Sequence, residues 1–300
     1  MQTDVWSLAQ QLSAALATIA TALMLVTLAK YIFGRIMLSG VKLDDELFIR
    51  DNPAAAIIVL GYGTALLAVA VGVAHVGAGE RVLHELAVLV CVVVAGGVLV
   101  LLGAIPLLLL EGVPVKTSIL EHRNVGVALA AAGAYVAEGF VVHGVVATSP
   151  GDVADASPAL WDETSIVAAL AFFAISQVPL ILAVILYRRL VGFDVKAELT
   201  RGNVAAGLSY GSCVAAMGLV IGHAARGEFR GWSTALTEFA VYAGFGLVLI
   251  PSLRFAVSAV LVPNSSLTHE VGRQDVPNWG AALLEAFAYL GAASIVVASS

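Results

Sequence analysis

Eight long apolar stretches constrain this chain more than any other feature of its sequence. Each is long enough to cross the apolar core of a bilayer, which takes about 20 residues of helix. Charged residues make up 12% of the 300 residues and hydrophobic residues 60%, whereas a soluble domain is about 25% charged. The sequence therefore predicts an all-α fold, a polytopic bundle of eight transmembrane helices. Segments of about ten residues with alternating polarity, which would build a β-barrel, are absent.

Short polar segments separate the predicted spans. The spans are Leu8–Phe33, Pro53–Val76, Glu85–Leu110, Asn124–Ala147, Ser165–Tyr187, Asn203–Ala225, Ser233–Leu253 and Asn278–Val297. No Lys or Arg precedes the first span, so we interpret it as a mature helix rather than a cleaved signal peptide. Both cysteines lie inside apolar runs, which is typical of small buried residues.

Positive charge gathers on one side of this predicted topology. The loops after the odd-numbered spans hold Lys30, Arg35, Lys42, Arg50, Lys116, Arg123, Arg188, Arg189, Lys196, Arg201, Arg254 and Arg273, and the opposite loops hold Arg81, Arg226 and Arg230. Basic loops stay in the cytoplasm, so twelve against three predicts that both termini lie outside. The central loop, Thr148–Glu163, agrees because it is acidic and lacks Lys and Arg.

Four similar helix openings indicate an internal repeat. Asn52, Asn124, Asn203 and Asn278 each lead into small apolar residues, at intervals of 72, 79 and 75 residues. Such a recurrence indicates one unit used four times, and its length fits two spans with their loops. Tyrosines and histidines also recur between the halves. We therefore predict two similar four-helix units, 1–150 and 151–300, repeated in parallel because each holds an even number of spans.

The residues that precede two of these helices match the pattern of a known family. Glu46-Leu47 leads to Arg50-Asp51-Asn52, and Glu198-Leu199 leads to Arg201-Gly202-Asn203, each before an Ala-rich span. This pattern resembles the YjfL-like family of bacterial inner-membrane proteins, a domain of unknown function (DUF350). The chain looks like two such domains fused, although Gly126 and Gly280 replace alanines of the simplest pattern. The resemblance implies a bacterial inner-membrane protein without an assigned activity. In such a membrane the charge bias of the loops predicts periplasmic termini.

The four asparagines have a structural and a functional interpretation. Asparagine is among the best N-cap residues because its side chain accepts hydrogen bonds from the first free N–H groups of a helix. We interpret Asn52, Asn124, Asn203 and Asn278 as caps. The alternative is a site where four positive helix ends bind a cytoplasmic anion or lipid headgroup.

Two acidic residues fall inside predicted spans, where an ionisable side chain is a functional-site hypothesis by default. Glu138 lies 14 residues after Asn124 and Glu285 lies 7 residues after Asn278. With a rise of about 1.5 Å per residue, they are about 21 Å and about 10 Å from the cytoplasmic ends of their helices. We expect Glu138 to face the interior of the bundle.

Three further side chains complete this candidate intramembrane polar site: Tyr135, Tyr289 and His143. Tyr135 lies one turn before Glu138 and could donate a hydrogen bond to it, whereas His143 is about 140° around the helix from Glu138. The carboxyls are either protonated packing contacts or carriers of protons or cations. The sequence leaves both interpretations open.

No enzyme motif stands out in the sequence. It contains no HExxH pair, no phosphate-binding glycine loop and no nucleophile elbow, so we predict no catalytic residue, metal site or cofactor. No basic run suggests nucleic acid. The simplest function is a non-enzymatic scaffold in the lipid bilayer that binds cytoplasmic or membrane partners, or copies of itself. The alternative is a channel or transporter for protons, cations or a small solute that uses Glu138 and Glu285.

Overall fold

A computed structural model of the chain describes residues 5–73, 82–147, 163–226, 231–262 and 265–299. Within these residues the chain forms α-helices, and eight of them are long and apolar enough to cross a membrane. The helices are α1 (Val5–Ile36), α2 (Leu43–Phe48), α3 (Pro53–Val73), α4 (Val82–Glu111), α5 (Val115–Leu120), α6 (Val125–Val146), α7 (Glu163–Leu190), α8 (Val195–Thr200), α9 (Val204–Ala224), α10 (Trp232–Leu261), α11 (Leu267–Gly272) and α12 (Trp279–Ser299). The chain is thus a multi-pass membrane protein.

The predicted repeat of two spans is present four times. Each repeat consists of a long helix, a helix of six residues and a second long helix, in the order α1–α2–α3, α4–α5–α6, α7–α8–α9 and α10–α11–α12. The two halves of the chain therefore have the same helix order. The six-residue helices were not predicted, because they are too short to show a hydrophobic period.

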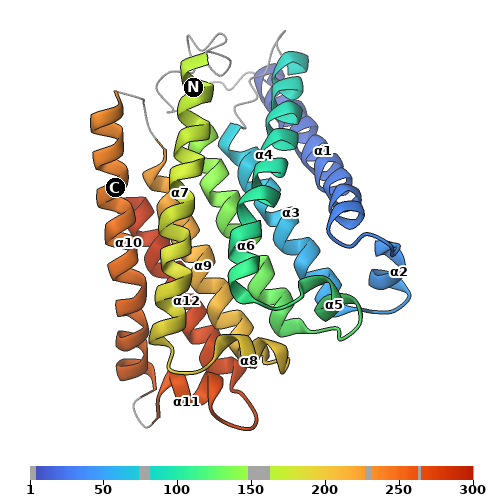
Figure 1. The fold of residues 1–300 in the computed structure, drawn as a ribbon. Coiled ribbons are helices and arrows are strands. Elements are labelled where there is room, and N and C mark those ends of the chain that lie inside the picture. The colour runs from blue at the N-terminus through green and yellow to red at the C-terminus, as the bar shows by residue number, and fades with distance from the viewer. Residues whose placement is uncertain (1–4, 74–81, 148–162, 227–230, 263–264, 300) are drawn as a thin grey trace.

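The long helices form two layers (Figure 1). The second long helices of the repeats lie side by side as an inner row, α3–α6–α9–α12, and the first long helices cover one side of it. The six-residue helices all lie at one end of the bundle, next to the starts of the inner-row helices. Helices α6 and α9, at the middle of the row, are the most deeply buried spans.

Small residues let the inner-row helices approach closely, as is common in membrane bundles. A Cβ on Gly133 of α6 would collide with the backbone of Gly211 in α9, and one on Gly144 would collide with the backbone of Gly222. The same relation joins α3 to α6, where Gly61 faces Ala132. Helices α6 and α9 therefore pack with their backbones in contact over most of their length, and this contact unites the two halves.

The two ends of the inner row expose large apolar side chains on their outer faces. The outer face of α3 exposes Leu60, Leu67 and Val71, and the outer face of α12 exposes Leu283 and Phe287. Large apolar side chains fit a surface that meets lipid tails and would prevent close backbone contact with a further helix. Within the described residues the row contains four repeats, with α3 and α12 as its outer helices.

Each inner-row helix begins after the same sharp turn. The backbone N–H groups of the four asparagines donate to carbonyls of the preceding six-residue helix, at 2.8–3.0 Å. In three repeats the residue before the asparagine has a positive φ: Asp51 (47°), Arg123 (49°) and Gly202 (87°). Glycine adopts this conformation without steric cost, whereas Asp51 and Arg123 adopt it under the constraint of the turn.

The structure differs from the sequence prediction at the seventh span. We placed its end at Leu253 and Arg254 in a cytoplasmic loop, but α10 continues to Leu261 and Arg254 is buried within it. The boundaries of the other spans shift by up to a few residues. The predictions for residues 148–162 of the central loop, Arg81 and Arg230 lie outside the described residues.

Candidate functional site

The four asparagines cap the inner-row helices as predicted. The side-chain oxygen of Asn52 accepts from the N–H groups of Ala54 and Ala55, at 3.1 and 3.2 Å. Asn124, Asn203 and Asn278 each accept from the N–H group three residues on, at 3.0–3.1 Å. Each asparagine therefore satisfies at least one N–H group that the helix leaves free.

The side-chain amides of three asparagines also tie each repeat to the next. Asn52 donates to the carbonyl of Ile119 at 2.9 Å, and Asn124 donates to that of Leu199 at 2.7 Å. Asn203 continues the series with the carbonyl of Val271, at 2.7 Å. Every acceptor lies in the six-residue helix of the following repeat. These three asparagines are buried beneath that helix, which fits their interpretation as caps better than an open anion site.

Asn278 belongs to the last repeat of the described residues and is exposed. Its amide donates to Glu270 at 3.0 Å, within its own repeat. Hydrogen bonds from Ser265, Asn278 and Gln274 to the Glu270 carboxylate lower the pKa of Glu270 below its usual range. The carboxylate is therefore ionised at neutral pH, where its charge also opposes anion binding at this helix end.

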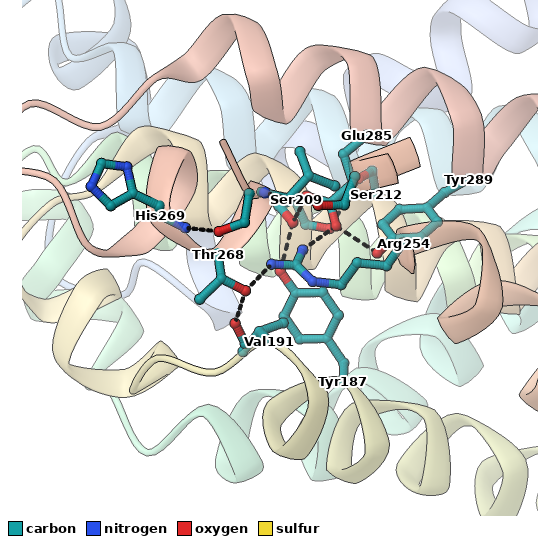
Figure 2. Close-up of polar contacts among 12 residues, drawn as sticks. Tyr187, Val191, Ser209, Ser212, Arg254, Thr268, His269, Glu285 and Tyr289 are labelled. Atoms are coloured by element: carbon teal, nitrogen blue, oxygen red, sulfur yellow. Dashed lines mark hydrogen bonds and ion pairs between the residues drawn. The ribbon is translucent and has the colours of Figure 1, made fainter. Parts of the chain in front are cut away.

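Glu285 is fully buried in the inner row and has hydrogen-bond partners on both carboxyl oxygens (Figure 2). Arg254 of α10 forms an ion pair with its Oε1 atom. The hydroxyl of Tyr289 donates to Oε1 and that of Ser209 donates to Oε2, each at 2.6 Å. Because Ser209 donates to Glu285, the Tyr187 hydroxyl, 2.6 Å away, donates to Ser209. Through this network, in which each charge has a partner, Glu285 of α12 is linked to α7, α9 and α10.

Arg254 is the residue of this network that sequence reasoning missed. Its Nη2 atom also reaches the hydroxyl of Thr268, at 3.4 Å, which in turn donates to the carbonyl of Val191 at 2.7 Å. The signal was present in the sequence, since Arg254 follows an apolar run without a turn residue and Pro251 can continue a kinked membrane helix. Glu285, a buried acid in the neighbouring span, is stabilised by a buried base such as Arg254.

Glu138 is also fully buried but is poorly satisfied. Gln177 of α7 donates to its Oε2 atom at 3.1 Å. Within the described part of the chain, Glu138 Oε1 and Gln177 Oε1 have no hydrogen-bond partner. The carboxyl lies against Gly103 of α4. A Cβ atom added to Gly103 would lie 2.5 Å from the Cδ atom of Glu138. Glycine at position 103 therefore leaves the room that the Glu138 carboxyl occupies.

The other two residues expected near Glu138 do not bond to it. Tyr135 was placed where it could donate to Glu138, but its hydroxyl is buried and lacks a hydrogen-bond partner among the described residues. Its ring packs instead against Phe33 and Tyr62, with centroids 5.5 and 5.8 Å away. The Nδ1 atom of His143 contacts the carbonyl of Ala68 in α3, at 2.8 Å. The candidate polar site is thus divided into separate groups.

Another buried acid, Glu111, was not among the predicted site residues. It is the last residue of α4 and is 2% exposed, and neither carboxyl oxygen has a hydrogen-bond partner in the residues that the structure describes. Arg188 of α7 interacts with it electrostatically but donates its hydrogen bond to the carbonyl of Leu110, at 2.5 Å. Sequence counting placed Glu111 one residue beyond a span and therefore in water.

Comparison with known proteins decides the family. The model of the family described as Domain of Unknown Function (DUF350) matches residues 7–146 and again residues 160–300. The chain belongs to the DUF350 family. It contains two DUF350 domains in tandem, which confirms the resemblance inferred from the asparagine motifs. No curated protein and no solved structure matches the chain.

The two DUF350 domains share their caps and tyrosines but not their buried acids. Tyr135 and Tyr289 both lie 11 residues after the capping asparagine, whereas Glu138 corresponds by this count to Ala292, and Glu285 to Ala131. The acid of the second domain is paired with an arginine, and that of the first is not. Among the described residues of these domains, no three His, Cys, Asp or Glu side chains come together as metal ligands would.

Proposed function

We propose that this DUF350 protein is a non-enzymatic membrane protein that binds and conducts protons or small cations through its first domain, with Glu138 as the central carrier. The observation that carries this proposal is the carboxyl oxygen Oε1 of Glu138, which is buried and lacks a hydrogen-bond partner among the described residues. Leaving a buried polar group unpaired is costly. Such a group in a native structure calls for an explanation, and inside a membrane the first is ion or proton binding.

The contrast with Glu285 supports this assignment. Glu285 has the same chemistry and the same burial, yet an arginine and two hydroxyls satisfy it. A carboxylate that already holds a buried guanidinium is poorly suited to exchange a proton or cation. We therefore assign Glu285 to the stability of the second domain and Glu138 to function.

Flux through sealed liposomes tests the proposal. A pH-sensitive dye trapped inside liposomes reports proton entry when a membrane potential is imposed, and tracer uptake reports sodium or potassium. Wild-type protein should give flux above protein-free liposomes, and Glu138→Gln should reduce it to that background while remaining folded. Glu121→Gln, which changes an exposed acid at the end of α5, is the matched control and should conduct as wild type does. Wild-type liposomes without flux, or full flux with Glu138→Gln, would contradict the proposal.

A second candidate is a scaffold that binds cytoplasmic or membrane protein partners. It is favoured by large apolar side chains exposed at the end of the bundle that carries the six-residue helices: Phe48, Ile49, Val276 and Trp279. Exposed apolar groups beside charged loops are typical of interaction surfaces. Cross-linking in cells from position 49, compared with position 121, tests this candidate. A specific protein adduct from position 49 alone would support the scaffold, and adducts to lipid alone would count against it.

A further inference from the structure

Besides Glu138 Oε1, Ser176 Oγ and Gln177 Oε1, four buried side-chain oxygen atoms have no hydrogen-bond partner among the described residues. They are both carboxyl oxygens of Glu111 and the hydroxyls of Tyr135 and Tyr210. Tyr135 and Tyr210 are fully buried and Glu111 is 2% exposed. Three different helices, α4, α6 and α9, contribute these atoms. Unpaired buried groups are normally rare, so a cluster of them indicates a shared cause.

Three of these side chains interact electrostatically and lie at similar or successive levels of the bundle. The Glu111 carboxylate interacts electrostatically with both Tyr135 and Tyr210. Tyr210 lies 7 residues after Asn203, Tyr135 lies 11 residues after Asn124 and Glu138 lies 14 after Asn124. With a rise of about 1.5 Å per residue, these positions are about 10, about 16 and about 21 Å along the inner row. Glu111 lies at the end of α4 that adjoins the six-residue helices. The polar groups therefore form a line from that end of the bundle to Glu138.

The second domain has no such line. Tyr289 occupies the position of Tyr135 relative to the capping asparagine, but its hydroxyl donates to Glu285. The hydroxyl of Tyr187 is hydrogen-bonded as well. Buried tyrosines in this fold thus find partners where the sequence supplies them. The unpaired oxygens of Glu111, Tyr135 and Tyr210 lie on α4, α6 and α9, at the seam between the first domain and α9.

We propose that bound water fills the line Glu111–Tyr210–Tyr135 and makes it a proton path from the end of the bundle with the six-residue helices to Glu138. Water suits the line because it can donate to carboxylates and both donate to and accept from hydroxyls. Protons move along it by a sequence of transfers. Glu111 takes a proton from bulk water, each bridging water or hydroxyl accepts one proton and releases another, and the Glu138 carboxylate receives the last. This inference deepens the proposed function and rests on it for what happens to the proton after it reaches Glu138.

Other charged and titratable groups face this line. Arg188 of α7 interacts with Glu111 and Tyr210. Tyr62 of α3 interacts with Tyr135, and Tyr187 of α7 and Cys213 of α9 interact with Tyr210. Arg188 is the only fixed cation among these named groups. Its charge opposes a metal cation at the same place, which is why we assign the line to protons and water.

Radiolytic hydroxyl labelling of wild-type protein in lipid nanodiscs tests the water directly. Water held beside a buried side chain is split by the X-ray pulse and oxidises that side chain. We expect oxidation of Tyr135 and Tyr210, and no comparable oxidation of Tyr289 and Tyr187, which are equally buried but hydrogen-bonded to protein. Labelling of Tyr135 and Tyr210 no greater than that of Tyr289 would overturn the water-filled line, whatever the flux experiments show.

Flux of two variants tests the path. Tyr210→Phe removes one hydroxyl with little change in shape, and Glu111→Gln removes the entry acid. Each should lose most of the wild-type proton flux, whereas Tyr242→Phe, which changes a tyrosine outside the line, should retain it. Wild-type flux in both variants, or wild-type uptake of sodium or potassium without protons, would overturn the proton path. If Glu111→Gln does not fold, Tyr210→Phe alone decides. Water labelling without any wild-type flux would sink the proposed function and leave the hydrated line standing.

Discussion

The side-chain amide of Asn124 donates a hydrogen bond of 2.7 Å to the backbone carbonyl of Leu199, across the boundary between the two DUF350 domains. The same side chain caps α6 through its oxygen. Asn124 thus caps the start of α6 and also holds α8, the six-residue helix of the next repeat, against it. This double role explains why asparagine serves here better than serine or aspartate, which can cap a helix but cannot donate in the same way.

Replacing Asn124 should therefore cost more than replacing the exposed Asn278, whose amide bonds only within its own repeat. Asn124→Ala should lower the free energy of unfolding by about 2 kcal/mol, because the cap is lost and the Leu199 carbonyl remains buried without its donor. Asn278→Ala, at the exposed end of the series, should cost about 1 kcal/mol. Unfolding in mixed micelles with rising SDS measures both. Equal losses would show that the bond across the domain boundary contributes nothing.

The contact between α6 and α9 depends on the absence of side chains. Gly133→Ala places a methyl group against the backbone of Gly211 and should lower the free energy of unfolding by about 1–3 kcal/mol through overpacking. Gly291→Ala adds the same methyl group to α12, where nothing lies within 4 Å. This control should be neutral or stabilise by up to about 1 kcal/mol. The same SDS titration compares the two, and a stable Gly133→Ala protein would contradict the close packing.

The ion pair between Arg254 and Glu285 should matter mainly when it is broken on one side. Arg254→Met leaves a buried carboxylate uncompensated and should cost about 3–5 kcal/mol. The double variant Arg254→Met/Glu285→Gln removes both charges while Ser209 and Tyr289 keep a polar partner, so it should recover most of that loss. Unfolding titrations of the single and double variants form a cycle. A double variant as unstable as the single one would mean that packing, not charge, explains the loss.

The orientation in the membrane remains a prediction. Removing the buried Arg254 from the twelve basic residues of one side leaves eleven against three, so the charge bias still predicts that both termini are periplasmic. Alkaline phosphatase, which is active only after export, should be active when fused after Ser300, and a green fluorescent protein that matures in the cytoplasm should be dark there. Fluorescence at that fusion point would reverse the orientation and would place the entry at Glu111 on the outer side.

Much of the fold could be predicted from the sequence because a bilayer allows few solutions. Apolar runs that must satisfy their own backbone groups become helices, and the four asparagines mark where the inner-row helices begin since capping is a local interaction. The repeat, the tandem domains and the burial of Glu138 and Glu285 follow from these local facts. The six-residue helices and the full length of α10 do not, because neither departs enough in hydropathy from its surroundings.

Which polar groups meet was decided only by the tertiary structure. Glu138 and Glu285 look equivalent along the chain, yet Arg254 reaches one of them across 31 residues and Gln177 reaches the other across 39. The neighbours of Glu111, Tyr135 and Tyr210 come from different repeats, and their proximity depends on how closely glycines let α6 and α9 approach. Hydropathy and capping act within one helix, so the sequence specifies them directly. Pairing of buried polar atoms depends on rotation and spacing between helices, which only the packed bundle determines.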